Sequence, residues 1–296
     1  MTRSFVWLDV FTDRPYSGNP LAVFPDAVGL TDVQMATIAR ELNLSETTFV
    51  FPPEDGTATH RVRIMTPTRE LPFAGHPTVG TAIALATLAG GPGEKVAADY
   101  VFALQAGPTA VSVHTLVSGT MEASFVAPKT PVLGVAPVTA DELAHRLGLD
   151  RSDLDDTVPP HLTDSGGTVF LTAVVTSLEA LRRASLVGSI GDIVGVYVAY
   201  RTDSGWQARM FAPAAGVVED PATGSATCSF AGTLHAYVES FSADGTYDVS
   251  LRQGVEMGRP SELSLSFDVS DGEICEVRLR GGAVVVLHGE IEEPTR

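Results

Sequence analysis

Residues 220–226 read Asp-Pro-Ala-Thr-Gly-Ser-Ala, and a closely similar stretch, His-Pro-Thr-Val-Gly-Thr-Ala, occurs at residues 76–82. The offset of 144 residues between the two turns is nearly half of the 296-residue chain. Each turn follows a strand-like segment that carries an arginine, residues 63–67 in the first case and 209–213 in the second. A repeat of that period indicates two similarly folded halves, each with one such turn.

Proline is favoured in the first turn of a helix, where its fixed φ is already helical and its missing N–H would have no partner. We therefore expect each turn to open a helix, with His76 and Asp220 at the N-cap positions. Gly80 and Gly224 would allow backbone N–H groups to approach a ligand. A helix N-terminus attracts anions, so two such termini facing each other could bind a carboxylate. Asp is also a preferred N-cap, which leaves a purely structural role for Asp220 open.

The composition is that of a globular protein, since 44% of the residues are hydrophobic. The net charge is −17 and Lys and Arg form no cluster, which argues against nucleic acid or an anionic membrane as a partner. The two cysteines, Cys228 and Cys275, and the seven scattered histidines predict neither a disulfide framework nor a metal site. Residues 1–10 include an acidic residue and indicate a strand rather than a signal peptide, so we expect a cytoplasmic protein.

Local patterns predict the elements that come before the first turn. A capping-box pattern at residues 31–34 predicts a helix over residues 32–42. The β-branched and aromatic residues 47–51 predict a strand, so Glu46 is expected at a helix-to-strand junction. A single Glu at such a place is most often a solvent-exposed carboxylate. Asn19 precedes a proline and is expected in a loop.

Two apolar segments, residues 77–88 and 226–238, are expected to form buried helices after the two turns. Strand patterns surround both segments, and a sheet that curls around a helix would bury it on all sides. The predicted fold class is α+β, with two pseudo-symmetric halves that are each a curled mixed β-sheet or barrel around a central helix. A connector rich in Pro and Gly, residues 128–137, predicts an N-terminal half of residues 1–128 and a C-terminal half of residues 129–296. The sequence leaves open whether the final strand returns to the first half.

Four motifs include these turns and extend beyond them. They read Gly-Asn-Pro-Leu-Ala-Val at residues 18–23, Leu-Asn-Leu-Ser-Glu-Thr-Thr-Phe at 42–49, Glu-Leu-Pro-Phe-Ala-Gly-His-Pro at 70–77 and Glu-Asp-Pro-Ala-Thr-Gly-Ser-Ala at 219–226. In this order they resemble the motifs of the phenazine biosynthesis PhzF-like isomerase family. The resemblance spans most of the chain. It implies a diaminopimelate-epimerase-like fold, generally as a homodimer that works without a metal ion or an organic cofactor.

The resemblance also implies roles for individual residues. Glu46 matches the catalytic glutamate of the family, and His76 and Asp220 match site residues that would act with it. The residues expected to bind substrate are Asn19, Ser45, Gly75, Gly224 and Ser225. We expect all these residues to converge on one cavity between the halves, because ligand sites are common at such places. Related epimerases use cysteines at two helix starts, where His76 and Asp220 are expected here, so a two-thiol racemase is not expected.

These observations predict a cofactor-independent isomerase that moves a proton between carbons of a small metabolite carrying a carboxylate. Glu46 would remove the proton from one carbon and return it to another. Two alternatives remain open at this point. One is an epimerase or racemase that acts on an amino-acid-like substrate, and the other is a small-molecule binding protein that retains the fold without turnover. The motifs do not identify the substrate or its pathway.

Overall fold

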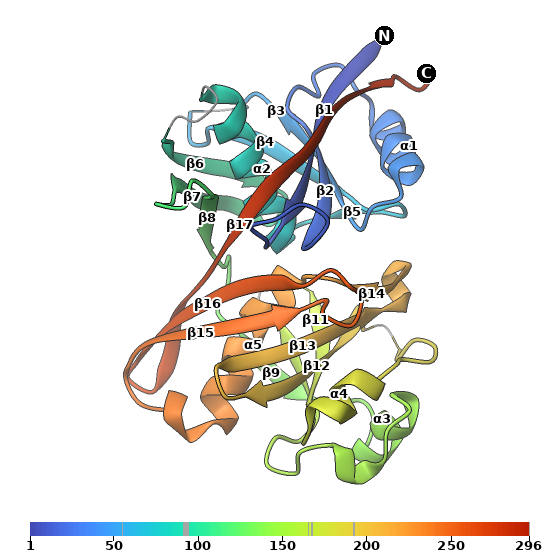
Figure 1. Ribbon diagram of the computed structural model, residues 1–296, viewed down its shortest axis with the longest axis vertical. Coiled ribbons are helices and arrows are strands. Elements are labelled where there is room, and N and C mark those ends of the chain that lie inside the picture. Colours follow the sequence, from blue (N-terminus) through green and yellow to red (C-terminus); the bar gives the residue numbers. More distant parts are fainter. Residues whose placement is uncertain (55, 91–94, 165, 167, 192, 296) are drawn as a thin grey trace. The chain divides into compact units, whose positions relative to one another are not determined.

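The computed structural model of the chain describes residues 1–54, 56–90, 95–164, 166, 168–191 and 193–295 (Figure 1). The chain forms two compact units. Unit 1 contains Met1–Pro128 and Arg280–Arg296, and unit 2 contains Lys129–Leu279. The chain thus leaves unit 1 at the start of the connector expected from the sequence. The chain returns to unit 1 at Arg280 for its last residues.

Unit 1 is a mixed β-sheet that closes on itself. Its strands are β1 (Thr2–Val10), β2 (Asn19–Phe24), β3 (Thr47–Phe51), β4 (His60–Met65), β5 (Glu70–Leu71), β6 (Ala97–Leu104), β7 (Gly107–Thr115), β8 (Met121–Val126) and the later part of β17 (Glu273–Glu292). The strands pair in the order β17, β1, β2, β3, β4, β6, β7 and β8, and β8 pairs with β17 again. The pairings of β2 with β3 and of β4 with β6 are parallel. Such a ring encloses an interior that one helix can fill.

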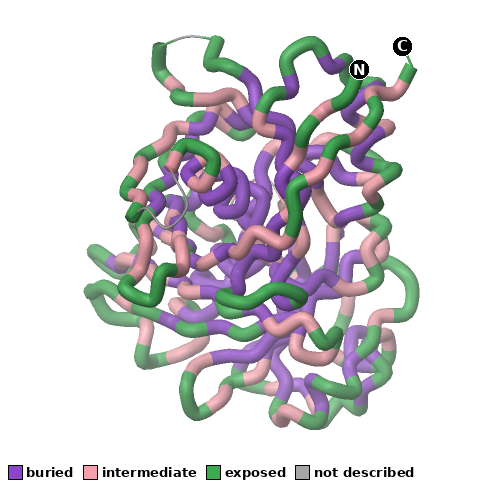
Figure 2. The backbone as a smooth tube through the Cα atoms, turned by 45° about the horizontal axis from the view of Figure 1, so that its top comes forward, coloured by how far each residue is buried: buried purple, intermediate pink, exposed green. Residues whose placement is uncertain are grey.

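The helix α2 (Gly75–Ala89) lies at the centre of unit 1, and Figure 2 shows most of it as buried. It contacts β1, β2, β3, β7 and β8. Its sequence contains no Asp, Glu, Lys or Arg, and a helix that is apolar all round is stable only where it is surrounded. Helix α1 (Asp32–Leu42) begins with the predicted capping box of Thr31 and Gln34 and contacts β3 and β4.

Unit 2 follows the same plan around a second helix, α5 (Gly224–Tyr237). Its strands are β9 (Val132–Val135), β10 (His161–Asp164), β11 (Val169–Val174), β12 (Gly195–Thr202), β13 (Gly205–Ala212), β14 (Val217–Asp220), β15 (Gly245–Gln253), β16 (Ser261–Ser270) and the first part of β17. They pair in the order β9, β10, β11, β12, β13, β15 and β16, and β14 pairs with β13. Helix α5 contacts β9, β10, β11 and β16. The predicted α+β class, with a curled mixed sheet around one central helix in each half, is confirmed.

Two shorter helices, α3 (Ala140–Arg146) and α4 (Leu178–Arg183), pack together with β11 and β12. Their buried side chains include Leu143 of α3 and Leu181 of α4, and they form an apolar cluster with Leu171 and Val198 from the two strands. Both helices begin at an N-cap residue whose hydroxyl accepts a backbone N–H, Thr139 in α3 and Ser177 in α4.

The two units repeat in a register different from the one expected from the two turns. Helix α2 begins at Gly75 and helix α5 at Gly224, and each follows a short strand, β5 or β14, after three intervening residues. The equivalent segments therefore read Glu-Leu-Pro-Phe-Ala-Gly at 70–75 and Glu-Asp-Pro-Ala-Thr-Gly at 219–224. The structural offset is 149 residues instead of 144.

An arginine from the neighbouring strand holds the glutamate that opens each equivalent segment. Arg63 of β4 donates to both carboxylate oxygens of Glu70, and Arg209 of β13 donates to both of Glu219. Arg209 Nη1 also donates to three carbonyl oxygens at the end of α4. Because a bidentate pair fixes orientation as well as distance, each pair anchors the short strand before a central helix.

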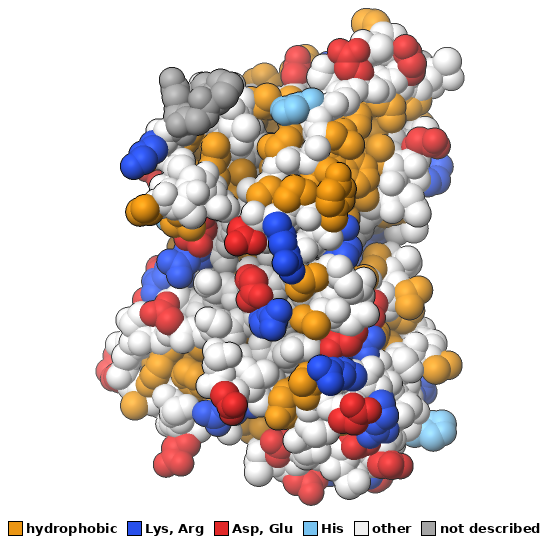
Figure 3. Space-filling model, viewed as in Figure 1, with side chains coloured by type: hydrophobic (Ala, Val, Ile, Leu, Met, Phe, Trp, Pro, Cys, Tyr) orange, Lys and Arg blue, Asp and Glu red, His pale blue; other side chains and the backbone are white. Residues whose placement is uncertain are grey.

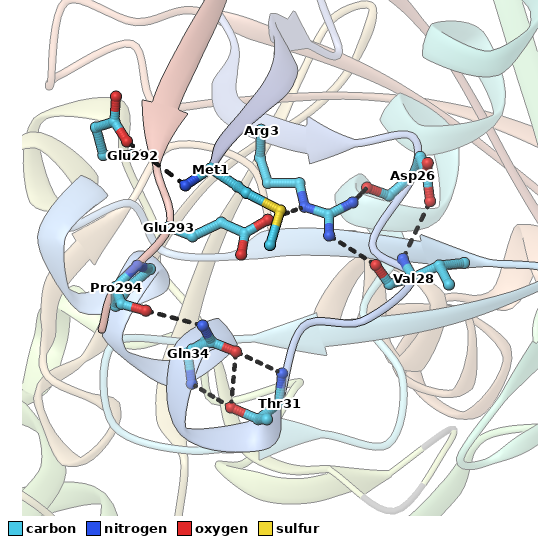
Figure 4. A network of polar contacts seen from close by, with 9 residues as sticks. All are labelled: Met1, Arg3, Asp26, Val28, Thr31, Gln34, Glu292, Glu293 and Pro294. Carbon is cyan, nitrogen blue, oxygen red and sulfur yellow. Dashed lines mark hydrogen bonds and ion pairs between the residues drawn. The ribbon is translucent and has the colours of Figure 1, made fainter. Parts of the chain in front are cut away.

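Polar contacts fasten the two ends of the chain to each other in unit 1 (Figure 4). The backbone N–H of Glu293 donates to the carbonyl oxygen of Met1 at 2.7 Å, and Arg3 Nε donates to the Glu293 carboxylate at 2.8 Å. Gln34, which completes the capping box of α1, donates from Nε2 to the carbonyl oxygen of Pro294. Strand β1, helix α1 and the end of the chain therefore share one polar network.

Acidic and basic side chains are interspersed on the face of the molecule shown in Figure 3. This mixing agrees with a sequence in which Lys and Arg are scattered despite a net charge of −17. Within the described part of the chain, no helix is both long and apolar enough to cross a membrane.

Candidate functional site

Glu46 lies between the end of α1 and the start of β3, as the sequence predicts. Asn43 ends α1 in the left-handed conformation, with φ 50° and ψ 36°, and its N–H donates to the carbonyl oxygen of Ala39. Strand β3 then begins at Thr47, opposite Ala22 of β2. Glu46 is thus held one residue before the wall of the barrel. Its side chain is only 16% exposed, so it is not the solvent-exposed carboxylate that a single Glu usually forms.

His76 faces Glu46 from the first turn of α2. Its Nε2 lies 3.5 Å from Oε2 of Glu46, and its side chain is 3% exposed. Burial lowers the pKa of His76 to about 3, because the charged imidazolium would lose its hydration. The ring is therefore neutral at pH 7, and its contact with Glu46 is not an ion pair. Among the described residues, His76 Nε2 has no hydrogen-bond partner.

Asn19 and Ser45 complete this group in unit 1. The side-chain amide of Asn19 lies 3.2 Å from His76 Nδ1, and the Ser45 hydroxyl donates to Asn19 Oδ1 at 3.2 Å. Asn19 is the first residue of β2 and is fully buried, so the expectation of a loop position was wrong. The pairing of β1 with β2 extends to Asn19, opposite Val10, and this draws the side chain into the barrel. Four of the predicted residues thus form one chain of contacts.

A second group of predicted residues lies in unit 2, at the start of α5. Asp220 ends β14 with 9% exposure, and the Thr223 hydroxyl donates to its carboxylate at 2.5 Å. Gln253, at the end of β15, donates from Nε2 to the carbonyl oxygen of Asp220 at 2.7 Å and accepts from the Thr223 N–H at 3.2 Å. Sequence reasoning missed Gln253, because a glutamine in a strand carries no local signal of such a contact.

The predicted N-cap positions of His76 and Asp220 were wrong. The N-caps are Ala74 for α2 and Thr223 for α5, and neither makes a side-chain capping bond. His76 is the second residue of its helix, and Asp220 precedes the other helix by four residues. The residue of α5 that corresponds to His76 is Ser225.

The predicted glycines also divide into two kinds. Gly75 and Gly224 are the first residues of the two helices, where their N–H groups have no partner within the helix. Gly80 lies inside α2, where a Cβ would come within 2.5 Å of Leu21 and 2.7 Å of Val10. Gly80 therefore serves the close packing of α2 against β1 and β2 and not the approach of a ligand.

The two groups belong to different units of the chain, one with Glu46, His76, Asn19 and Ser45 and the other with Asp220. Their expected convergence on one cavity stays a prediction. In the described ranges, no three His, Cys, Asp or Glu residues lie together in a way that could hold a metal ion. Both groups present carboxylates and neutral hydrogen-bonding side chains, which can exchange protons with a substrate and bind its polar groups.

A family model described as a phenazine biosynthesis-like protein matches residues 8–289, which is nearly the whole chain. The chain belongs to this family. Among its phenazine biosynthesis-like relatives, an uncharacterised isomerase of Mesorhizobium japonicum is 38% identical over 98% of this chain and 99% of its own length. The trans-2,3-dihydro-3-hydroxyanthranilate isomerase of Pseudomonas fluorescens is 35% identical over 98% of this chain and 99% of its own.

A solved structure agrees with this assignment. The phenazine biosynthesis protein of the PhzF family from Bacillus anthracis matches with a TM-score of 0.87 and 25% identity, and the match covers 99% of both chains. The resemblance stated from the four sequence motifs is thus confirmed, and so is the fold that it implied. The phenazine biosynthesis-like family contains proteins named as isomerases.

Proposed function

We propose that this protein is an isomerase that moves a proton between two carbons of a small metabolite carrying a carboxylate. Two observations support the proposal. Two relatives that match over nearly the full length are named isomerases. In unit 1 the Glu46 carboxylate is largely buried and faces the neutral ring of His76 at 3.5 Å. A neutral neighbour leaves Glu46 as the group in this cluster that can take up a proton at pH 7.

The reaction needs only one acid–base group. The Glu46 carboxylate removes a proton from an acidic carbon of the substrate, and the electron pair of the broken C–H bond is delocalised towards the carboxylate of the substrate. The resulting carboxylic acid then returns the proton to a second carbon, which regenerates the carboxylate. Such a positioned acid or base contributes roughly 10²–10⁴-fold to the rate.

We further propose that Asp220 and Ser225 bind polar groups of the substrate. The Thr223 and Gln253 contacts hold Asp220 in one orientation, which suits a residue that positions a ligand. The N–H groups of Gly75 and Gly224, at the first positions of their helices, are donors that a carboxylate could use. In this proposal Asp220→Asn and Ser225→Ala raise KM as well as lowering kcat.

Turnover in heavy water tests the proposal. The first probe is trans-2,3-dihydro-3-hydroxyanthranilate, the compound in the name of the Pseudomonas fluorescens relative. A set of small cyclic and amino-acid-like carboxylates completes the panel. NMR should show deuterium at the receiving carbon, because the carboxylic acid exchanges with solvent before it delivers its proton. Deuterium at the original carbon with inverted configuration would instead show an epimerase.

The matched pair of variants is Glu46→Gln and Glu41→Gln. Gln keeps the size of Glu but cannot accept the proton, so Glu46→Gln should lose at least about 10²-fold in kcat, or roughly 2.7 kcal/mol of barrier. Glu41 is an exposed residue of α1, and its replacement should leave kcat unchanged. A Glu46→Gln variant with nearly normal kcat would remove Glu46 from the mechanism.

A further inference from the structure

The hydrogen bonds around His76 run in one direction. Ser45 donates its hydroxyl proton to Asn19 Oδ1, and the NH₂ group of Asn19 lies 3.2 Å from His76 Nδ1. Asn19 is fully buried and His76 is almost fully buried, so bulk water does not replace these contacts. A buried polar group that loses its hydrogen bond is left unsatisfied, so these contacts persist in the folded protein.

This direction determines which nitrogen of His76 carries the proton. A neutral imidazole has one N–H donor and one acceptor nitrogen. An amide NH₂ can only donate, so Nδ1 must accept and the proton must reside on Nε2. The other side of the ring leads to the same result, because Nε2 faces Oε2 of Glu46 at 3.5 Å and an ionised carboxylate can only accept.

The opposite arrangement is unfavourable on the Glu46 side of the ring. Turning the Asn19 amide over would place Oδ1 beside Nδ1 and would require the proton on Nδ1. The lone pair of Nε2 would then point at the carboxylate of Glu46, and two acceptors would face each other in a buried place. In the favourable orientation, the hydroxyl of Ser45 donates to Oδ1 and gives the amide a second hydrogen bond.

We propose that Asn19, oriented by Ser45, is a positioning residue that holds His76 in the neutral tautomer with the proton on Nε2. His76 then presents a fixed hydrogen-bond donor towards Glu46. It does not relay the transferred proton, because Nδ1 is occupied by an amide N–H that does not give up a proton at neutral pH. This last consequence rests on the proposed function, whereas the tautomer itself does not.

The tautomer can be read without a substrate by NMR of protein labelled with ¹⁵N in its histidines. A protonated and an unprotonated imidazole nitrogen have well-separated ¹⁵N shifts, and their couplings to the ring protons distinguish Nδ1 from Nε2. The signals of His76 are those that disappear in His76→Gln. We expect the wild-type ring to be protonated on Nε2 and not on Nδ1 at pH 7. Protonation on Nδ1 in the wild type would overturn the proposal, whatever the enzyme turns over.

Asn19→Asp tests the role of the amide. Its carboxylate has nearly the same shape but can only accept, so the proton of His76 should move to Nδ1, or both nitrogens should become protonated. Asn43→Asp makes the same chemical change at the exposed end of α1 and should leave the His76 signals unchanged. An Asn19→Asp variant that keeps the Nε2–H tautomer would contradict the proposal.

Ser45→Ala gives a milder second test, should Asn19→Asp fail to fold. Without the hydroxyl donor, the amide loses the contact that orients it, and a second set of His76 signals from the Nδ1–H tautomer should appear. A Ser45→Ala spectrum identical to the wild type would show that Ser45 does not orient Asn19.

Discussion

His76 shows how burial alone can set the charge of a side chain. Its ring lies in the first turn of a helix that the barrel surrounds, and its near neighbours are the Asn19 amide and the Glu46 carboxylate. A carboxylate at 3.5 Å would favour the imidazolium, yet desolvation is the larger effect and lowers the pKa of His76 to about 3. The residue is therefore a neutral donor at every pH at which the enzyme is expected to work.

This burial predicts sensitivity to acid. Unfolded His76 takes up a proton as the pH falls below 6.5, whereas folded His76 stays neutral down to a pH of about 3. Its contribution to stability is complete above pH 6.5 and decreases by about 1.4 kcal/mol for each pH unit below it. Gln at position 76 does not titrate. Urea unfolding at several pH values should therefore show that the free energy of unfolding of His76→Gln rises relative to that of the wild type as the pH falls from 6.5 to about 4. A constant difference between the two proteins would contradict the lowered pKa.

At the scale of the element, α2 packs closely against the barrel at Gly80, where it has no side chain. Gly80 faces Leu21 of β2 and Val10 of β1, and an added Cβ would lie only 2.5 Å and 2.7 Å from them. Both neighbours belong to strands of the closed ring, which limits how far they can move apart. The glycine in this turn thus lets the barrel close around α2.

Gly80→Ala should therefore destabilise the protein by about 1–3 kcal/mol, the usual range for overpacking a core. Gly56→Ala is the control, because a Cβ there meets nothing within 4 Å. Urea unfolding should give a lower midpoint for Gly80→Ala and an unchanged one for Gly56→Ala. Equal midpoints for the two variants would show that α2 can shift to accept the methyl group.

The turn before α5 depends on a different kind of contact. Gln253 is fully buried and bonds both the carbonyl oxygen of Asp220 and the N–H of Thr223. Gln253→Met keeps the volume but leaves both backbone groups without this partner, which should cost about 1–3 kcal/mol for each group. Arg252→Met, next in the strand, removes only an exposed ion pair with Glu262 and should cost less than about 1 kcal/mol. Thermal unfolding of the two variants compares these costs, and similar Tm values would refute a role for Gln253 in holding the turn.

Local signals in the sequence predicted the individual elements better than they predicted which segments of the two units are equivalent. The capping box of Thr31 and Gln34 predicted the start of α1, because a cap involves only neighbouring residues. The first turn region contains Pro-x-x-Gly twice, at residues 72–75 and 77–80, and the sequence comparison matched the second copy to residues 221–224. Only the positions of β5 and β14 show that the first copy is the equivalent one.

The difference between local patterns and long-range contacts also explains what the sequence indicated at the site and which contacts it did not indicate. Motifs indicated Glu46, His76 and Asp220 as residue types at recognisable positions. The contact of Asn19 with His76 joins residues 57 positions apart, and that of Gln253 with Thr223 joins residues 30 positions apart. Such pairs depend on how strands align in the sheet, which no local pattern encodes.

At the scale of the whole molecule, the two units cannot be separated by a single cut. Strand β17 (Glu273–Glu292) starts in unit 2 and ends in unit 1, where it pairs with both β1 and β8. A fragment of residues 1–128 would lack this strand, and both neighbours would become open edges. Open edges of that length favour association between chains over folding of the single chain.

We therefore expect residues 1–128 alone to aggregate or to remain without cooperative unfolding. Residues 1–128 joined to 280–296 through a flexible Gly/Ser linker of about ten residues should fold, since such a linker spans roughly 15–20 Å and the missing strand is restored. The restored segment also supplies Glu293 for Arg3 and Pro294 for Gln34 (Figure 4). Circular dichroism during heating and dispersed NMR signals should distinguish the two proteins. A cooperative transition in residues 1–128 alone would show that β17 is not needed to close the barrel.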